Sequence, residues 1–310
     1  MVPVTKLKNR VENNCILQVF KPFFLLFNFI GCTALNINLQ FSWLSSAHAI
    51  LVILSMVGIT SYVLSDNDDG SVLEESTAAV RLIDRIKVGC AAGAATVCTT
   101  INIMKTKPLM KLIAEIEQFS RTFPLQTRPF RWMALRSIFL AVLLASAGIQ
   151  EIIIEPETFT PLQIVSFVEY YCHLVLLFTE YQFAVFVRVL EALLKSVIDK
   201  LNHDGNNITR HAVRQSVKYE LLLKKFSEEL QSTFGVQIVV AVFSSFVVCL
   251  ISSYFALLYV INWFTESAAE LPTMTVMYAA WVLFIFLKAH EIVSSTHDLR
   301  AKVIIAEKKN

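Results

Sequence analysis

The chain has 310 residues, of which 55% are hydrophobic and 17% charged, and its mean hydropathy is +0.58. Soluble domains carry about 25% charged residues, so this composition leaves too little polar surface for a soluble globule of this size. The net charge of +2 is small, and its cations are distributed among membrane-flanking segments, which excludes a nucleic-acid-binding protein.

The segment before the first long hydrophobic stretch is apolar and aromatic. It reads ILQVFKPFFLLFNFIGCT at residues 16–33 and is interrupted by Lys21 and Pro22. Its phenylalanines suit an interfacial or re-entrant helix. A seventh span is the alternative, but it would place the four N-terminal cations outside, against the charge rule.

Six stretches are long and apolar enough to cross a bilayer as helices. A hydrocarbon core of about 30 Å requires roughly 20 apolar residues in a helix. The predicted spans lie near residues 42–64, 86–104, 133–154, 161–187, 236–263 and 272–290. The sequence therefore predicts an all-α fold, a multi-pass transmembrane helical bundle at 42–290 between a cytoplasmic N-terminal part at 1–41 and a cytoplasmic tail at 291–310.

The connections between the predicted spans alternate in charge. The first and third are acidic, with Asp66, Asp68 and Glu155 among their charges, whereas the second and fourth are rich in lysine and arginine, such as Lys111 and Lys224. Lysine and arginine near span ends resist translocation, so the basic side is cytoplasmic. Both termini are therefore predicted to lie inside.

The small residues of the second and fifth spans predict close helix packing. Gly89 and Gly93 lie four residues apart among alanines, and this spacing brings helix backbones together. Ser244 and Ser252 belong to a serine series in the fifth span that would donate hydrogen bonds across helices or line a polar seam.

The fourth span contains three ionisable residues on one helix face. Glu169, His173 and Glu180 are spaced by four and seven residues, which places them within about 40° of one another. A carboxylate in hydrocarbon needs water or a partner, so this face is expected to point into the bundle or a wet cavity. Both a ligand or ion pathway and a satisfied contact between helices fit this pattern.

The fourth connection is long enough to fold by itself. Apolar residues at helical spacing continue from Arg188 to a stop at 202–207, and a second helix is predicted from about Arg210 into the fifth span. Together they make a helical hairpin at about 188–235, either a solvated stalk or an intersubunit or coupling surface. The apolar residues of that surface would be Leu190, Leu193, Leu194, Ile198, Leu222, Leu223 and Phe226.

Motifs of enzymes and metal sites are absent from the sequence. There is no GxSxG, HExxH, P-loop or glycine-rich cofactor turn, and none of the six cysteines forms a CxxC pair. His290 and His297 could share a helix face, but a metal needs more ligands. We expect neither an enzyme, nor a cofactor, nor a metal.

Several of these features together resemble the insect gustatory receptor family, whose relatives are the insect odorant receptors. They are the lead-in ending in FNFIGC, the acidic outer loops, the inner hairpin, and the stretches TEYQFAVFVRVLEALLKSVIDKLN, FGVQIVVAVFSSFVVCLISSYFALLYVI and AHEIVSSTHDLRAKVII. Members of that family have a further, pore-lining helix with a Thr-Tyr…Gln-Phe signature, whereas this sequence stops at Asn310. The resemblance thus implies a truncated or spliced product, an incomplete gene model, or a subunit that depends on others.

The resemblance implies a plasma-membrane chemosensory receptor that detects small-molecule tastants. It would be a ligand-gated cation channel, a homo- or hetero-tetramer in the lipid bilayer with other receptor subunits. Its candidate pocket residues, chosen by depth and polarity, are Glu169, Tyr170, His173, Tyr254 and Tyr259. Two other classes stay open: a G-protein-coupled receptor, which needs its N-terminus outside, and a secondary transporter, which more often has internal repeats and broken helices.

Overall fold

A computed structural model of the chain describes the residues 20, 24–25, 27–28, 30–31, 42–65, 78–121, 135, 138–139, 141–142, 161–204, 210–265 and 283. The helices in these ranges are α2 (Trp43–Ser65), α3 (Ala78–Met104), α4 (Thr106–Ser120), α6 (Pro161–Asp204) and α7 (Arg210–Thr265), and the same ranges contain no strand. Four of these helices, all except α4, are long and apolar enough to cross a membrane. The all-α bundle is confirmed, while most of the predicted spans at 133–154 and 272–290 lies outside the described residues.

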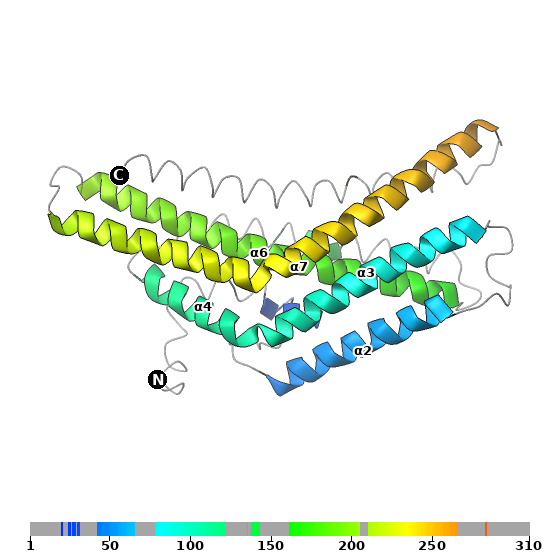
Figure 1. Ribbon diagram of the computed structural model, residues 1–310, viewed down its shortest axis with the longest axis horizontal. Coiled ribbons are helices and arrows are strands. Elements are labelled where there is room, and N and C mark those ends of the chain that lie inside the picture. The colour runs from blue at the N-terminus through cyan, green and yellow to red at the C-terminus, as the bar shows by residue number, and fades with distance from the viewer. Residues whose placement is uncertain are drawn as a thin grey trace.

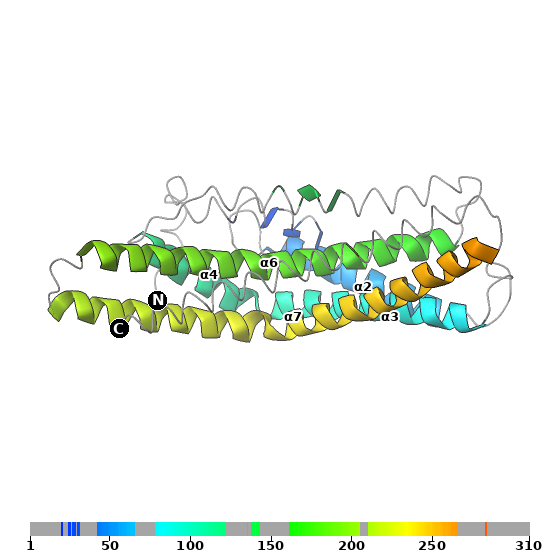
Figure 2. The same cartoon turned by 90° about the horizontal axis from the view of Figure 1, so that it is seen from above.

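Helices α6 and α7 are far longer than a bilayer is thick. α6 has 44 residues and α7 has 56, which correspond to about 66 and 84 Å of helix. They run antiparallel and side by side at the end where α6 stops and α7 starts, and α7 diverges from α3 toward its own C-terminal end (Figures 1 and 2). α6 continues past the predicted span at 161–187 to Asp204, and α7 starts at Arg210, ahead of the predicted span at 236–263.

The bundle is built around α3 and α6. α3 packs against α2, α6 and α7, so it links all three neighbours. In the most apolar 18 residues of α6, within Phe167–Asp199, 83% of the residues are buried, compared with 33% in the most apolar 18 residues of α7, within Leu221–Leu258. α6 is therefore the central helix, and α7 turns much of its apolar surface outward, as a helix in contact with lipid can do.

α4 is a helix where the sequence predicted only a basic connection. α3 ends at Met104, Lys105 forms a turn, and Pro108 lies in the first turn of α4, where a missing backbone N–H is tolerated. The buried residues of α4 recur at helical spacing and include Leu109, Leu112, Ile113, Ile116 and Phe119. This face of α4 packs against α7.

The α7 part of the hairpin is covered by α4 of the same chain. The ring of Phe119 lies 5.7 Å from that of Tyr219 and 5.9 Å from that of Phe226. Lys225 Nζ lies 2.8 Å from Glu115 Oε2 at the edge of this contact. The hairpin residues Leu190, Leu193, Leu194 and Phe226 are buried, and Leu222 and Leu223 pack against the same core. The expectation of a solvated stalk is therefore wrong, because the hairpin folds onto its own chain.

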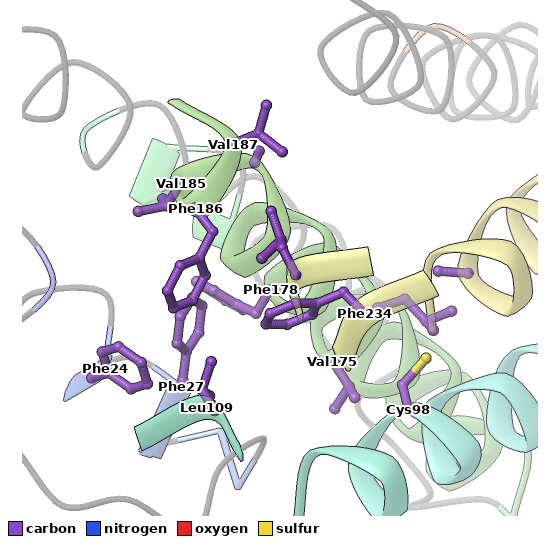
Figure 3. Packing of buried hydrophobic residues seen from close by; sticks show 14 of the residues in the cluster. Phe24, Phe27, Cys98, Leu109, Val175, Phe178, Val185, Phe186, Val187 and Phe234 are labelled. Carbon is purple, nitrogen blue, oxygen red and sulfur yellow. The ribbon is translucent and has the colours of Figure 1, made fainter. Parts of the chain in front are cut away.

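The aromatic lead-in is buried in the bundle. Phe20, Phe24 and Phe27 are at most 1% exposed, and Figure 3 shows Phe24 and Phe27 beside the α6 rings. Ring centroids are 4.8 Å apart between Phe20 and Phe186 and 5.8 Å apart between Phe27 and Phe178. The described part of this segment therefore packs inside the bundle, and the interfacial or re-entrant helix stays a prediction.

A turn follows the lead-in and is fixed by a glycine. The backbone N–H of Gly31 donates to the carbonyl of Asn28, and its φ of +75° is one that side chains disfavour. A Cβ at this position would lie 3.0 Å from Val52 Cγ2 of α2. Gly31 therefore lets the lead-in approach α2 closely.

The predicted packing of small residues in α3 holds for alanines and not for glycines. Ala91, Ala92, Ala94 and Ala95 are buried, whereas an added Cβ at Gly89 or Gly93 would meet no atom within 4 Å among the described residues. The expectation that this glycine pair brings helix backbones together is wrong there. The face of α3 that packs on the neighbouring helices is formed instead by these four alanines.

Candidate functional site

A polar cluster joins α3 and α6 near the first residues of both helices. Lys87 Nζ lies 3.0 Å from Glu169 Oε1, and the side chains of both residues are 13% exposed. One turn further along α6, His173 Nε2 lies 3.7 Å from the same carboxylate oxygen, and its side chain is 5% exposed. The helical spacing of four residues places Glu169 and His173 on one face, as the sequence predicted.

Lys87 is the functional residue that the sequence analysis did not connect with this cluster. It is a cation near the start of the second span, on the side where the connection is acidic. A lysine at that position opposes the charge rule, and this exception was the signal for a partner within the bundle. The contact itself depends on how α3 packs on α6, which helical spacing does not give.

The ion pair of the cluster joins one cation to one anion. A buried charge is stable only when it is paired and hydrogen-bonded, and Lys87 supplies a partner for Glu169. The arrangement is suited to hydrogen bonding with a neutral polar molecule, since ammonium, carboxylate and imidazole offer both donors and acceptors.

The other predicted pocket residues do not all join this cluster. Tyr170 is buried beside Glu169 on α6, and Glu180, on the same face as Glu169, is buried about 16 Å further along the helix. Tyr254 is 44% exposed, and its ring packs on Phe255 at 5.6 Å. Tyr259 belongs to α7, but its side chain lies outside the described residues. The end of α7 lies away from the start of α6 in Figure 1.

A second polar cluster, not predicted from the sequence, joins α3 to α7. Gln237 Nε2 donates to Asn102 Oδ1 at 2.9 Å and to the carbonyl of Cys98 at 3.3 Å. The thiol of Cys98 donates to the carbonyl of Gln237 at 3.6 Å. Nearer the outer end of α3, Ser244 Oγ donates to the carbonyl of Cys90 at 3.5 Å, which confirms the predicted donation across helices for this serine.

The described residues offer no metal site, since none of their histidines, cysteines, aspartates and glutamates gather in groups of three or more suited to a metal ion. The buried His173 lies 3.7 Å from Glu169 on α6, and the buried Glu117 pairs with Arg121 one turn along the chain.

The fold resembles that of a solved chemosensory receptor. The structure of the insect olfactory receptor OR5 from Machilis hrabei, in complex with eugenol, aligns with a TM-score of 0.54 over 88% of this chain and 77% of that chain. The two sequences are 12% identical, so this similarity establishes the fold alone. No curated protein sequence matches the chain.

A family model gives the classification that the fold alone does not. The model of the 7tm chemosensory receptors matches residues 20–300, which include every helix described above. This is a family of receptors and not of enzymes. The chain therefore belongs to the 7tm chemosensory receptor family.

Proposed function

We propose that this protein is a gustatory receptor, a subunit of a ligand-gated cation channel that detects small-molecule tastants. The observation that carries the proposal is the family match over residues 20–300. The gustatory assignment rests on the local likeness of the α6 and α7 sequences to gustatory receptors. The subunit would act in the plasma membrane as part of a homo- or hetero-tetramer, with both termini in the cytoplasm.

The ligand site that we propose is the outer part of the bundle around Glu169, Tyr170 and His173. The supporting geometry is the ion pair between Lys87 and Glu169, whose partial exposure leaves its polar atoms within reach of a small molecule. The receptor of similar fold was solved with eugenol, which is consistent with a small organic ligand here. Tyr254 and Tyr259 of α7 complete the candidate set, as residues that would meet a ligand if α7 moves toward α6.

Binding would act by favouring one of two arrangements of the bundle. A ligand shifts such an equilibrium only as far as its affinities for the two states differ. α6 and α7 are continuous from the outer cluster to the hairpin, so a tilt at one end is carried to the other. The hairpin with α4 is the coupling element in this proposal.

The test is electrical recording from cells that express the chain alone or with other receptor subunits. A panel of soluble tastants and a panel of volatile odorants are applied, and a cation current evoked by tastants supports the proposal. Responses to odorants alone would replace gustatory by olfactory function. Uptake of a compound without current would indicate a transporter, and an N-terminal tag reached on intact cells would indicate the orientation of a G-protein-coupled receptor.

A further inference from the structure

Beside the contact between α3 and α7, three buried polar side-chain atoms have no hydrogen-bond partner among the residues that the structure describes. They are Thr99 Oγ1, Asn102 Nδ2 and Gln237 Oε1. The exposed fractions of these residues are 0%, 6% and 0%, so bulk water does not reach them. Most buried polar atoms in proteins are hydrogen-bonded, and each exception calls for a physical explanation.

The orientation of the Gln237 amide is fixed by its neighbours. Its Nε2 faces two acceptors, the carbonyl oxygen of Cys98 and Oδ1 of Asn102. Turning the amide over would put Oε1 against one or both acceptors. Gln237 Oε1 therefore points away from them and needs a donor from elsewhere.

The three atoms belong to side chains that are neighbours by hydrogen bonding or by helical spacing. Asn102 and Gln237 are already joined by a hydrogen bond of 2.9 Å, so their remaining amide atoms lie beside that bond. Thr99 is one turn before Asn102, and residues three apart on a helix have Cβ atoms about 5–6 Å apart. A single water with hydrogen bonds of about 2.8–3.0 Å spans such a separation.

We propose that this contact encloses a binding site for one water molecule. The water accepts a hydrogen bond from Asn102 Nδ2 and donates one to Gln237 Oε1, and the Thr99 hydroxyl makes the third bond. Three bonds are typical of buried waters, which occupy polar sites lined by such groups. The site lies three residues before the turn at Lys105, where α3 gives way to α4.

The substitution Thr99→Val tests the proposal by the sign of its effect. Valine has nearly the shape of threonine but no hydroxyl. If the hydroxyl binds water, its loss lowers the melting temperature of the purified receptor by about 2–4 °C. If the hydroxyl is unpartnered, the valine relieves the cost of burying it, and an unchanged or higher melting temperature overturns the proposal.

The neighbouring Thr100 provides the matched control. Its hydroxyl is exposed on the same helix and donates to the carbonyl of Thr96 at 2.8 Å. Thr100→Val should change the melting temperature by less than Thr99→Val. An equal fall in both variants would mean that valine weakens α3 as a helix, which also overturns the assignment of the effect to a water.

A map of the receptor that resolves ordered waters supplies the second measurement. Density within about 3.2 Å of both Asn102 Nδ2 and Gln237 Oε1 supports the site. A side chain from another segment at this position, or direct closure of the two amides onto each other, overturns it.

Discussion

At the scale of single residues, the stability of the outer cluster depends on one ion pair. Glu169 lies in the membrane-spanning part of α6, and the lysine that pairs with it, Lys87, belongs to α3. Removing one member of a buried pair leaves the other charge uncompensated, whereas removing both leaves none. Substitutions in this pair therefore measure how much it contributes to the contact between α3 and α6.

We predict that Lys87→Met and Glu169→Gln each destabilise the receptor, by on the order of 3 kcal/mol, and that the double variant loses less than the sum of the two. Thermal unfolding in detergent, followed for the four proteins of the cycle, measures the coupling. Additive losses would mean that the two side chains do not interact.

An exposed lysine–glutamate pair within α4 serves as the control for this cycle. Lys111 Nζ lies 3.6 Å from Glu115 Oε1, and the lysine side chain is 67% exposed. Solvent-exposed pairs contribute little, so Lys111→Met is expected to cost less than about 0.5 kcal/mol. A loss as large as that of Lys87→Met would point to a general effect of removing lysines.

The same cluster illustrates what the sequence can and cannot predict about a site. The spacing of Glu169 and His173 was sufficient to place them on one face, because a helix has a fixed period. Lys87 was not predicted as their partner, since its distance from Glu169 depends on the packing of two helices. Gln237 was missed for the same reason, and it lies alone among apolar residues in the sequence.

At the scale of the elements, the aromatic lead-in is stabilised by the burial of phenylalanine rings against α6. Phe27 is 1% exposed, and its ring contacts those of Phe24 and Phe178. Phe27→Ala should cost about 3 kcal/mol, the usual loss for a buried phenylalanine. Leu25 in the same segment is 49% exposed, so Leu25→Ala should cost far less. Equal losses in thermal unfolding would contradict the packing of the lead-in against α6.

The contact between α4 and α7 predicts a dependence of stability on pH. The hydrogen bond from Lys225 lowers the pKa of Glu115 below its ordinary value of 4.5. A carboxyl with a lowered pKa stabilises the fold above that ordinary value, and the contribution is lost as the pH falls through the lowered pKa. The effect is small, because the side chains of Glu115 and Lys225 are 27% and 47% exposed.

We therefore expect the melting temperature of the wild type to fall as the pH is lowered from about 5 to about 3. The melting temperature of Glu115→Gln should fall less over the same range, because glutamine has no proton to gain. Lys225→Met should flatten the pH dependence as well, since it removes the cause of the shift. Parallel curves for the wild type and Glu115→Gln would show that this pair does not stabilise the fold.

Helix α4 and the hairpin differ in how far their sequences predicted them. The hairpin was predicted because apolar residues keep helical spacing up to a polar stop at 202–207. α4 has the same kind of spacing, at Leu109, Leu112, Ile116 and Phe119, but the sequence analysis described this segment only as a basic connection. Its partner surface is formed by α7, so tertiary contact decided what the local sequence left open.

At the scale of the whole molecule, the long helices divide the protein into two parts. About 30 Å of each helix suffices to cross the hydrocarbon core, whereas α6 and α7 are about 66 and 84 Å long. The excess gathers at one end, where α4 covers the hairpin, while α2 and α3 accompany the other part (Figure 1). A substantial helical unit must therefore project from one face of the membrane.

The positions of the lysines predict on which face of the membrane the projecting unit lies. The projecting unit carries Lys218, Lys224 and Lys225 on α7 and Lys107 and Lys111 on α4, whereas the connection at 66–77 is acidic. Because lysine and arginine near span ends stay in the cytoplasm, we expect the hairpin to lie inside and the 66–77 connection outside.

Epitope tags measure this orientation directly. A tag at the N-terminus or in the 205–209 connection of the hairpin should bind antibody only after the cells are permeabilised, and a tag in the 66–77 connection should bind on intact cells. The projecting unit would then be positioned to receive motion from α6 and α7 and pass it to neighbouring subunits. If the 205–209 tag is reached from outside, the hairpin cannot be the cytoplasmic coupling element, and the outer cluster around Glu169 would face the cell interior.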